Sequence, residues 1–245
     1  MMTPAPQKKC PVKRSVKRPA RRSVRAFGLA AACAGAAFWM LTACSSAPKP
    51  ADWQIEAKGA MERSVAAYLE GNSRVEAVEF ARAKAEISST GRVELLARAE
   101  LLRCASHVAS LVFEPCAGFE AVRQDAPAAE RAYADYLAAA LPPQGAALLP
   151  AQHRAALSGG DAAVRAIADP LSQLVAAGVA FQSGRASPAL VQLAVDAASR
   201  QGWRRPLLAW LGVQASLLDK SGLPEEAARV RRRIALTQGD AKAVR

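Results

Sequence analysis

Apolar residues recur at intervals of three and four along most of the chain beyond residue 51, with polar residues between them. This spacing places the apolar side chains on one face of an α-helix, whereas a half-buried strand alternates at every second residue. No segment shows sustained alternation rich in Val, Ile, Thr and aromatic residues. The pattern predicts an all-α fold with helices over residues 52–70, 73–89, 90–111, from 127 onwards, 161–168, 170–182, 187–202, 203–220 and 224–237.

Capping and turn residues mark where several of these helices begin. Ser73 with Glu76 three residues later has the pattern of a capping box. Residues 158–160, Ser-Gly-Gly, are expected to form a turn, with Asp161 capping the helix that follows; an anion at this helix N-terminus is the alternative. The residues expected to be buried in the first three helices are Ile55, Met61, Val65, Tyr68 and Leu69, then Val75, Val78, Ala81 and Ala85, then Leu95, Leu96, Ala99 and Leu102.

Residues 215–236 carry the pattern of an antiparallel helical hairpin. A small residue, Ala215, lies in the first helix, Gly222 occupies the turn, and Ala227 follows that glycine by five residues. This arrangement resembles a tetratricopeptide repeat, in which small residues lie where the two helices cross. The resemblance implies a solenoid of α-hairpins.

A second segment, residues 60–87, resembles another copy, with Tyr68, Gly71 and Ala77. Its spacing from glycine to alanine is one residue longer than in the first copy. The middle of the chain, residues 113–160, fits no copy. An irregular helical bundle therefore stays open as the alternative to a tetratricopeptide-like array.

Charge is distributed unevenly along the chain. The formal net charge is +12, but residues 1–43 hold nine basic residues and no acidic one. Residues 44–245 carry 24 basic and 21 acidic residues, a net charge of +3. A nearly neutral body disfavours nucleic acid as a partner. The 51% of hydrophobic residues excludes a disordered chain.

The beginning of the chain has the three parts of a secretory signal peptide: a basic region over residues 1–25, an apolar region over 26–40, and small residues before a cysteine. The last part, Leu41-Thr42-Ala43-Cys44, resembles the bacterial lipoprotein box, and all four positions match. The resemblance implies that signal peptidase II removes residues 1–43 and that acyl chains are attached to Cys44.

Three acyl chains on Cys44, as the lipoprotein resemblance implies, would form a durable membrane anchor. Residues 44–51 would then be a lipidated tether, and residues 52–245 an α-helical periplasmic domain. Ser45 stands where lipoproteins retained in the inner membrane usually carry Asp, so the resemblance favours the outer membrane, with the inner membrane left open.

Two alternatives concern how the leader is used. Residues 26–43 approach the length of about 18–20 apolar residues that spans a bilayer, so an uncleaved anchor is the alternative to cleavage. In both cases the basic flank stays cytoplasmic and the body faces the periplasm. Residues 21–24, Arg-Arg-Ser-Val, match the twin-arginine signal weakly, and an extended basic region is the simpler interpretation.

Five cysteines divide by position: Cys10 and Cys33 lie in the leader, and Cys44 is the expected acyl acceptor. The remaining two, Cys104 and Cys116, form an even pair in a compartment that oxidises thiols. We predict a disulfide between them, which stabilises a loop of this length by about 3 kcal/mol on the chain-entropy model. The alternative is a metal site that adds His107, although the sequence offers no fourth ligand.

The sequence contains no catalytic motif of the nucleophile-elbow, zincin, phosphate-loop or dinucleotide-binding kind. Its two histidines have no fixed spacing to a nucleophile or a ligand set. We expect His107 to be a partly buried packing residue and His153 to lie on a solvated helix face. The chain is accordingly predicted not to be an enzyme, with no catalytic residue, no metal and no cofactor.

One arginine cluster stands out in the last predicted helix, where Arg229, Arg232 and Arg233 share a face. Arg204 and Arg205 lie one helix earlier. The cluster could contact an anionic partner, such as a lipid phosphate or an acidic protein surface. The alternative is a solvated outer face that faces Glu225 and Glu226.

These observations favour a protein-binding scaffold or adaptor that is anchored to the outer membrane through acyl chains on Cys44 and acts in the periplasm. Helical hairpins without a catalytic set are the basis for that expectation. The alternatives are an accessory factor or enzyme of peptidoglycan or envelope metabolism, and a carrier of an apolar ligand. A continuous groove, a polar cleft or a closed apolar cavity would distinguish the three.

Overall fold

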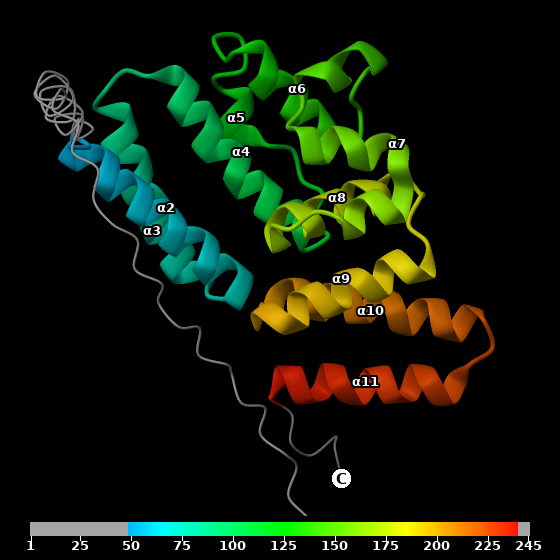
Figure 1. Cartoon of the computed structure of the whole chain (residues 1–245). Helices are drawn as coiled ribbons and strands as arrows, with labels where there is room; N and C mark the ends of the chain where they lie inside the picture. The colour runs from blue at the N-terminus through cyan, green and yellow to red at the C-terminus, as the bar shows by residue number, and fades with distance from the viewer. Residues whose placement is uncertain (1–48, 240–245) are drawn as a thin grey trace, which may run out of the picture. The chain divides into compact units, whose positions relative to one another are not determined.

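The computed structural model describes residues 49–239, and its contacts separate residues 1–49 from a second unit, residues 50–245. Every described helix belongs to the second unit, and the described residues contain no strand, so the predicted all-α class is confirmed (Figure 1). The elements are α2 (Asp52–Glu70), α3 (Ser73–Ser88), α4 (Val93–Ala109), α5 (Ala117–Glu120), α6 (Ala128–Leu137), the 3-10 helix η2 (Pro143–Leu148), α7 (Ala151–Arg165), α8 (Pro170–Gln182), α9 (Pro188–Gln201), α10 (Arg204–Lys220) and α11 (Pro224–Gln238).

Neighbouring helices pack as antiparallel pairs, most extensively α2 with α3, α10 with α11 and α9 with α10 (Figure 1). Helices α2 and α3 form an antiparallel pair, called here the first hairpin. Because the chain reverses direction again before α4, α2 and α4 run in the same direction along one side of this hairpin. Helix α4 is central, since it packs against α2, α3, α5, α6 and α8. The position of α4 therefore determines how the first hairpin meets the rest of the unit.

The core is built largely from alanine and branched aliphatic residues in two clusters. The larger one extends from α4 to α11, and the smaller one joins α2, α3 and the start of α4. Trp210 of α10 is fully buried, and its indole Nε1 donates a hydrogen bond of 3.0 Å to the carbonyl oxygen of Ala109. Small side chains allow the helices to approach closely, and the indole fills the space where α10 meets the end of α4.

The predicted buried face of α3 is wrong. Val75, Val78, Ala81 and Ala85 all lie on the exposed side of the helix. The buried residues are instead Glu76, Phe80, Ala83 and Ile87. Both faces of α3 carry apolar residues at helical spacing, and the face with the larger side chains is buried because it removes more apolar area from water. The helix also begins differently: the Asn72 side chain, rather than a capping box at Ser73, accepts a hydrogen bond from the backbone N–H of Val75.

One further prediction is corrected by the structure, and another is confirmed. In α4, Leu102 is more than one third exposed, whereas its neighbour Leu101 is buried. In α7, the predicted break before Asp161 is present, because Gly160 has a non-helical backbone (φ 57°, ψ −151°), although the segment that follows ends at Arg165 rather than near residue 168. The Asp161 carboxylate accepts a hydrogen bond from the Ser187 hydroxyl, a contact between elements that local spacing does not reveal.

The hairpin of α10 and α11 has small residues where its helices cross, since Ala215 and Ala227 are buried and Gly222 turns the chain with a φ of 72°. In the hairpin of α2 and α3, Ala77 is exposed. The residue five positions after the turn glycine there is Glu76, which is buried and ion-paired. In the hairpin of α2 and α3, the position that corresponds to Ala227 is therefore occupied by a charged residue. The alanine of the sequence pattern, Ala77, comes one position later and is exposed.

Candidate functional site

An apolar groove lies along α2 and α4, with a volume of about 700 Å³. Residues of α2 form one wall, and residues of α4 form the other. Ile87 of α3 contributes to the lining, as do Leu171 of α8 and Trp203, which directly precedes α10. The groove is thus assembled from segments that are far apart in the sequence but adjacent in the second unit.

The α2 wall follows from a strict spacing of four residues. Trp53, Ala57, Met61, Val65 and Leu69 lie on one stripe of the helix and all line the groove. Leu95, Ala99 and Leu102 form the corresponding stripe on α4. The sequence predicted most of these residues to be buried stripes, but it gave no sign that the two stripes face a shared open space.

The groove continues into a second apolar hollow of about 440 Å³, because Arg98 and Leu102 line both. Tyr133 of α6 lines the second hollow together with Leu148, Leu149 and Pro150. Leu102 and Leu148 are 37% and 46% exposed, respectively. Exposed leucines at the edges of a continuous apolar surface are typical of a binding site rather than of a closed core.

The charged residues that line the groove are Lys58, Glu62, Arg92 and Arg98. Each cation has a carboxylate partner, since Lys58 pairs with Glu62, Arg92 with Glu94 and Arg98 with Glu130. Arg98 lies where the two hollows meet, and its Nε is 2.6 Å from Oε1 of Glu130. The Arg98 side chain is 63% exposed, whereas that of Glu130 is 8% exposed. The guanidinium therefore presents most of its remaining donors to the solvent at this point.

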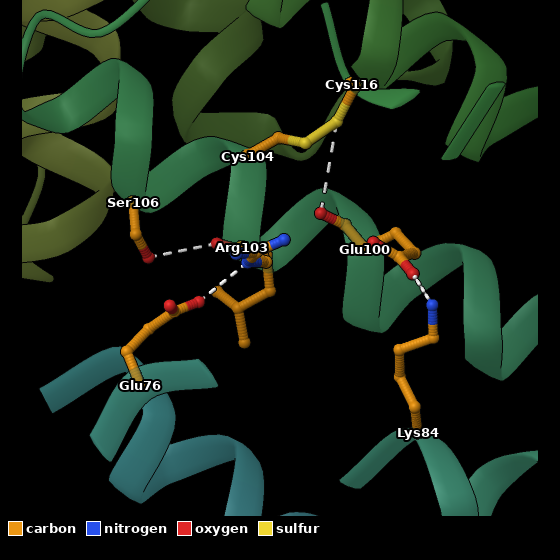
Figure 2. Close-up of a disulfide and its surroundings, with 8 residues drawn as sticks. Glu76, Lys84, Glu100, Arg103, Cys104, Ser106 and Cys116 are labelled. Atoms are coloured by element: carbon orange, nitrogen blue, oxygen red, sulfur yellow. Dashed lines mark hydrogen bonds and ion pairs between the residues drawn. A yellow bond between two sulfur atoms is a disulfide. The ribbon is translucent and has the colours of Figure 1, made fainter. Parts of the chain in front are cut away.

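Two ion pairs hold α4 against α3 on the side away from the groove (Figure 2). Arg103 Nε lies 2.6 Å from Glu76 Oε1, and Lys84 Nζ lies 2.6 Å from Glu100 Oε1. Both carboxylates are nearly buried, and each cation is partly exposed. Losing a cation would leave a buried carboxylate unpaired, which is costly. The pairs thus fix the helix that forms one wall of the groove.

The structure joins Cys104 of α4 to Cys116 by a disulfide, with a Cα–Cα distance of 6.0 Å, as the sequence predicts (Figure 2). Since the two sulfurs bond to each other, they are not ligands of a metal with His107. No group of three or more His, Cys, Asp or Glu residues in the described part of the chain is arranged to hold a metal ion. The disulfide ties the segment before α5 to α4.

A Cβ atom on Gly118 of α5 would lie 2.0 Å from Oε2 of Glu100, so a larger residue there would force the Glu100 carboxylate to move. The disulfide holds α5 close to α4, and the absence of a side chain at Gly118 leaves room for the Glu100 carboxylate between the two helices. A pocket of about 590 Å³ lies beside them and includes His107, Glu114 and Arg123. This pocket, which has charged as well as apolar residues in its lining, is on a different face of α4 from the apolar groove.

His107 packs as the sequence predicts, partly buried and stacked on Tyr68, with ring centroids 4.4 Å apart. Burial lowers the pKa of His107, and the nearby positive charge of Arg103 lowers it further. The guanidinium of Arg205 lies 4.3 Å from the Tyr68 ring centroid and donates to the backbone oxygen of Tyr68 at 2.7 Å. Arg205 is therefore a contact between α10 and the first hairpin.

His153 is buried, so the prediction of a solvated helix face is wrong. Its Nδ1 lies 3.2 Å from the Tyr136 hydroxyl, and its ring also packs against Tyr133. Burial lowers the pKa of His153 to about 4, with a smaller opposing effect from Asp169. The prediction of exposure relied on the polar neighbours of His153 in the sequence, Gln152 and Arg154. The aromatic residues that cover His153 belong to α6, so the sequence around His153 does not reveal them.

The arginines predicted to contact an anionic partner are only partly brought together. Arg229 and Arg233 line a hollow of about 600 Å³ between α9, α10 and α11, and Arg232 is exposed outside this lining. Arg229 Nη2 lies 3.6 Å from Glu226 Oε1, and Arg231 forms an ion pair with Asp219. A contact with an anionic partner at Arg229, Arg232 and Arg233 stays a prediction.

Cys44, the expected site of lipidation, lies outside the described residues. Within residues 49–239, no helix is both long and apolar enough to cross a membrane. No family model, no curated protein and no solved structure matches this chain.

Proposed function

We propose that this protein is a lipid-anchored adaptor of the bacterial cell envelope that binds a partner protein in the apolar groove between α2 and α4. The observation that supports this most directly is the groove itself: an open, mostly apolar surface along α2 and α4, beside a second apolar hollow that α4 shares with α6. Clefts that bind through shape and apolar contact have such linings, whereas catalytic sites concentrate titratable groups.

The anchoring part of the proposal rests on the leader and on Leu41-Thr42-Ala43-Cys44. A disulfide between Cys104 and Cys116 is consistent with it, because disulfides persist in oxidising compartments such as the periplasm. The eight residues from Cys44 to the first residue of α2 reach at most about 28 Å when extended. The groove, which begins at Trp53, would therefore stay close to the membrane surface, with the outer membrane favoured by Ser45.

Site-specific photo-crosslinking in cells tests the binding part. A photoreactive amino acid at Leu102, in the groove, is compared with one at Val78, which is 59% exposed on the outer side of α3. We expect a discrete crosslinked protein from Leu102 and none of the same mass from Val78. Equal products from both positions, or none from Leu102, would contradict an adaptor; a product with lipid alone would favour an apolar-ligand carrier.

The anchor is tested separately with Cys44→Ser. We expect this variant to lose incorporation of labelled palmitate and to leave the membrane fraction, while a Cys33→Ser control keeps both. Continued palmitate labelling of Cys44→Ser would contradict lipidation at this cysteine. Separating inner from outer membranes on a density gradient then decides which membrane holds the protein.

A further inference from the structure

A hollow of about 600 Å³ lies between the last three helices and shares no lining residue with the α2–α4 groove. Leu217 and Leu218 of α10 line it, together with Val191 of α9 and Val230 of α11. Apolar side chains from all three helices thus surround one space, called here the α9–α11 hollow. Sites for small molecules have volumes of about 300–1,000 Å³ and mostly apolar linings. The α9–α11 hollow therefore has the size and the apolar lining that one small ligand requires.

Two arginines of α11 give this hollow a charged wall. Arg229 and Arg233 are four residues apart, so they lie on the same side of the helix, and both line the hollow. Arg229 Nη2 is 3.6 Å from Oε1 of Glu226, another lining residue, which is longer than a hydrogen bond of about 2.7–3.2 Å. No carboxylate of the described residues forms an ion pair with Arg233. Both arginines are exposed, so guanidinium N–H groups are available to an acceptor in the hollow.

The opposite wall, on α9 and α10, has no positively charged residue in its lining. Its largest polar groups are two amides that bond to each other, since Gln214 Nε2 donates to Gln192 Oε1 at 2.5 Å. Gln192 Nε2 in turn donates to Asp196 Oδ1 at 2.8 Å, so a carboxylate lies next to this wall. An anionic group in the hollow is consequently attracted to the arginines of α11 and repelled from the α9 side.

The three helices around the hollow also carry a net positive charge. Residues 188–239 contain eight Lys and Arg residues against four Asp and Glu residues, whereas residues 50–187 contain thirteen against sixteen. The nearly neutral body is therefore the sum of two parts of opposite net charge. A positively charged part of a protein concentrates anions near its surface, and salt weakens this effect. The charge of the three helices thus favours the same class of ligand as the two arginines.

From the apolar lining and the arginine wall together, we infer that the α9–α11 hollow binds an amphiphilic anion. Its acidic head group binds to the two arginines, and its alkyl chain lies over Leu217 and Leu218. Guanidinium groups bind carboxylates and phosphates alike, so a free fatty acid and a phospholipid share this chemistry. A peptide fits less well, because its buried N–H and C=O groups need partners, and the amides of Gln192 and Gln214 are already hydrogen-bonded. This inference is independent of a partner in the α2–α4 groove.

Photolabelling of the full-length protein in nanodiscs of phosphatidylcholine provides the test. Dodecanoate, dodecyl phosphate and dodecyltrimethylammonium, each with a diazirine near the end of the same chain, differ only in their head groups. We expect the two anions, but not the cation, to label residues that line the hollow, as located by mass spectrometry of the digested protein. Equal labelling by all three, or labelling only outside the hollow, would overturn the inference. Labelling by a peptide of Glu and Leu with the same diazirine, but not by dodecanoate, would do so as well.

Arg233→Gln and Arg232→Gln form a matched pair, because the two arginines are adjacent and exposed but only Arg233 lines the hollow. We expect Arg233→Gln to lower labelling by dodecanoate about tenfold, through the loss of a charge-assisted hydrogen bond, and Arg232→Gln to leave it unchanged. Because both side chains are exposed, the two variants should unfold at the same temperature as the parent protein. An equal loss of labelling in the two variants would indicate a nonspecific positive surface and refute the site.

Competition then identifies the source of the anion. Nanodiscs that contain phosphatidylglycerol should suppress labelling if a phospholipid head group is the ligand. If the ligand is a free fatty acid, only added unlabelled dodecanoate should suppress it. Suppression by either competitor supports the hollow as a site for an amphiphilic anion, whereas labelling that neither competitor reduces would contradict a saturable site.

Discussion

His153 is a neutral side chain in a buried aromatic environment. Its imidazole packs against Tyr133 and Tyr136, and Nδ1 has the Tyr136 hydroxyl as its partner. Adding a proton would place a positive charge among these rings, where only Asp169 offers an opposing charge nearby. The native state therefore favours the neutral form more strongly than the unfolded chain does.

Stability should consequently depend on this residue at mildly acid pH. The pKa of His153 is about 4 in the folded protein, below its value of about 6.5 in the unfolded chain. The stabilisation is complete above pH 6.5 and is lost as the pH falls towards 4, by about 3 kcal/mol in all. Urea unfolding at pH 7.5 and pH 4.5 measures the difference. His153→Gln should reduce this difference in the free energy of unfolding between pH 7.5 and pH 4.5. Part of the pH dependence that remains comes from His107, whose pKa is also lowered. An identical pH dependence in the variant would contradict the assignment.

Burial of single residues was predictable only where the signal is local. Met61 and Tyr68 were expected to be buried and are, because each belongs to an apolar stripe within one helix. His153 was not, since its neighbours in sequence are polar and the rings that cover it belong to α6. The burial of His153 depends on contacts with another helix, and the periodicity of residues within a single helix does not reveal such contacts.

At the scale of helices, α4 and α8 approach each other closely at Gly178. A Cβ atom on Gly178 would lie 2.4 Å from the carbonyl oxygen of Val108, a backbone atom that cannot rotate away. Gly178 therefore sets the distance between the two helices that join the first part of the fold to the rest. Gly178 lies in a run of small apolar residues in α8. The sequence predicts that this run is helical, but it does not predict the contact with Val108.

We predict that Gly178→Ala destabilises the protein by about 1–3 kcal/mol, because the two helices must separate to admit one methyl group. Gly212→Ala in α10 is the matched control: nothing lies within 4 Å of its Cβ position, so the change should raise stability by up to about 1 kcal/mol through helix propensity. Thermal or urea unfolding of the two variants measures both effects. Equal stability of the two proteins would show that the α4–α8 distance is not constrained by Gly178.

Helix boundaries were predicted better than helix faces. Expected ends near residues 70, 182, 220 and 237 agree closely with the structure, because glycine, proline and capping residues act locally. The exposed face of α3 was taken for the buried one, since Val75 and Val78 have the right spacing. Glu76 makes its own face look polar, and its ion pair with Arg103 allows that carboxylate to be buried together with the large apolar side chains of the face.

At the scale of the whole second unit, Arg205 connects parts of the chain that are more than 130 residues apart. Its Nε donates to the backbone oxygen of Tyr68, and its Nη2 donates to Ser73 Oγ at 2.7 Å. The guanidinium also stacks over the Tyr68 ring, whose other face meets His107. The sequence assigned Arg205 to an arginine cluster, but its contacts make it a link between α10 and the first hairpin.

Arg205→Gln should loosen the first hairpin without unfolding the helices at the other end. We expect amide hydrogen exchange in α2 and α3 to become about tenfold faster, which corresponds to about 1.4 kcal/mol, while α9 and α11 change little. Arg204→Gln is the control, because the Arg204 contact is a single exposed bond of 3.5 Å to Gln238. Faster exchange throughout the unit, or none, would contradict a local link. Arg205 links the segment that carries Trp203 to the hairpin that carries Ile87, and both of these residues line the groove. Arg205→Gln should therefore also lower the yield of the crosslink from Leu102.

The groove illustrates what the sequence could and could not reveal. The stripes of α2 and α4 were recognised as apolar, but a groove also requires that no third helix covers them. That depends on where Leu171, at the start of α8, and Trp203 lie relative to α2 and α4, which is a property of the assembled helices. The disulfide was accessible to sequence reasoning because spacing along one helix and a following loop limits the distance between its cysteines.

The three ion pairs around α4 have a consequence for how uniquely the chain folds. Alanine-rich helix surfaces resemble one another from turn to turn, so apolar packing alone would tolerate α4 displaced by one turn, about 5.4 Å. Such a displacement would separate Arg103 from Glu76, Lys84 from Glu100, and Arg98 from Glu130 at once. Three nearly buried carboxylates would then lose their cations, a penalty that excludes the displaced arrangement. The charged residues thus select one register among several that a smooth core allows, and substitutions at these sites are expected to be tolerated in pairs rather than singly.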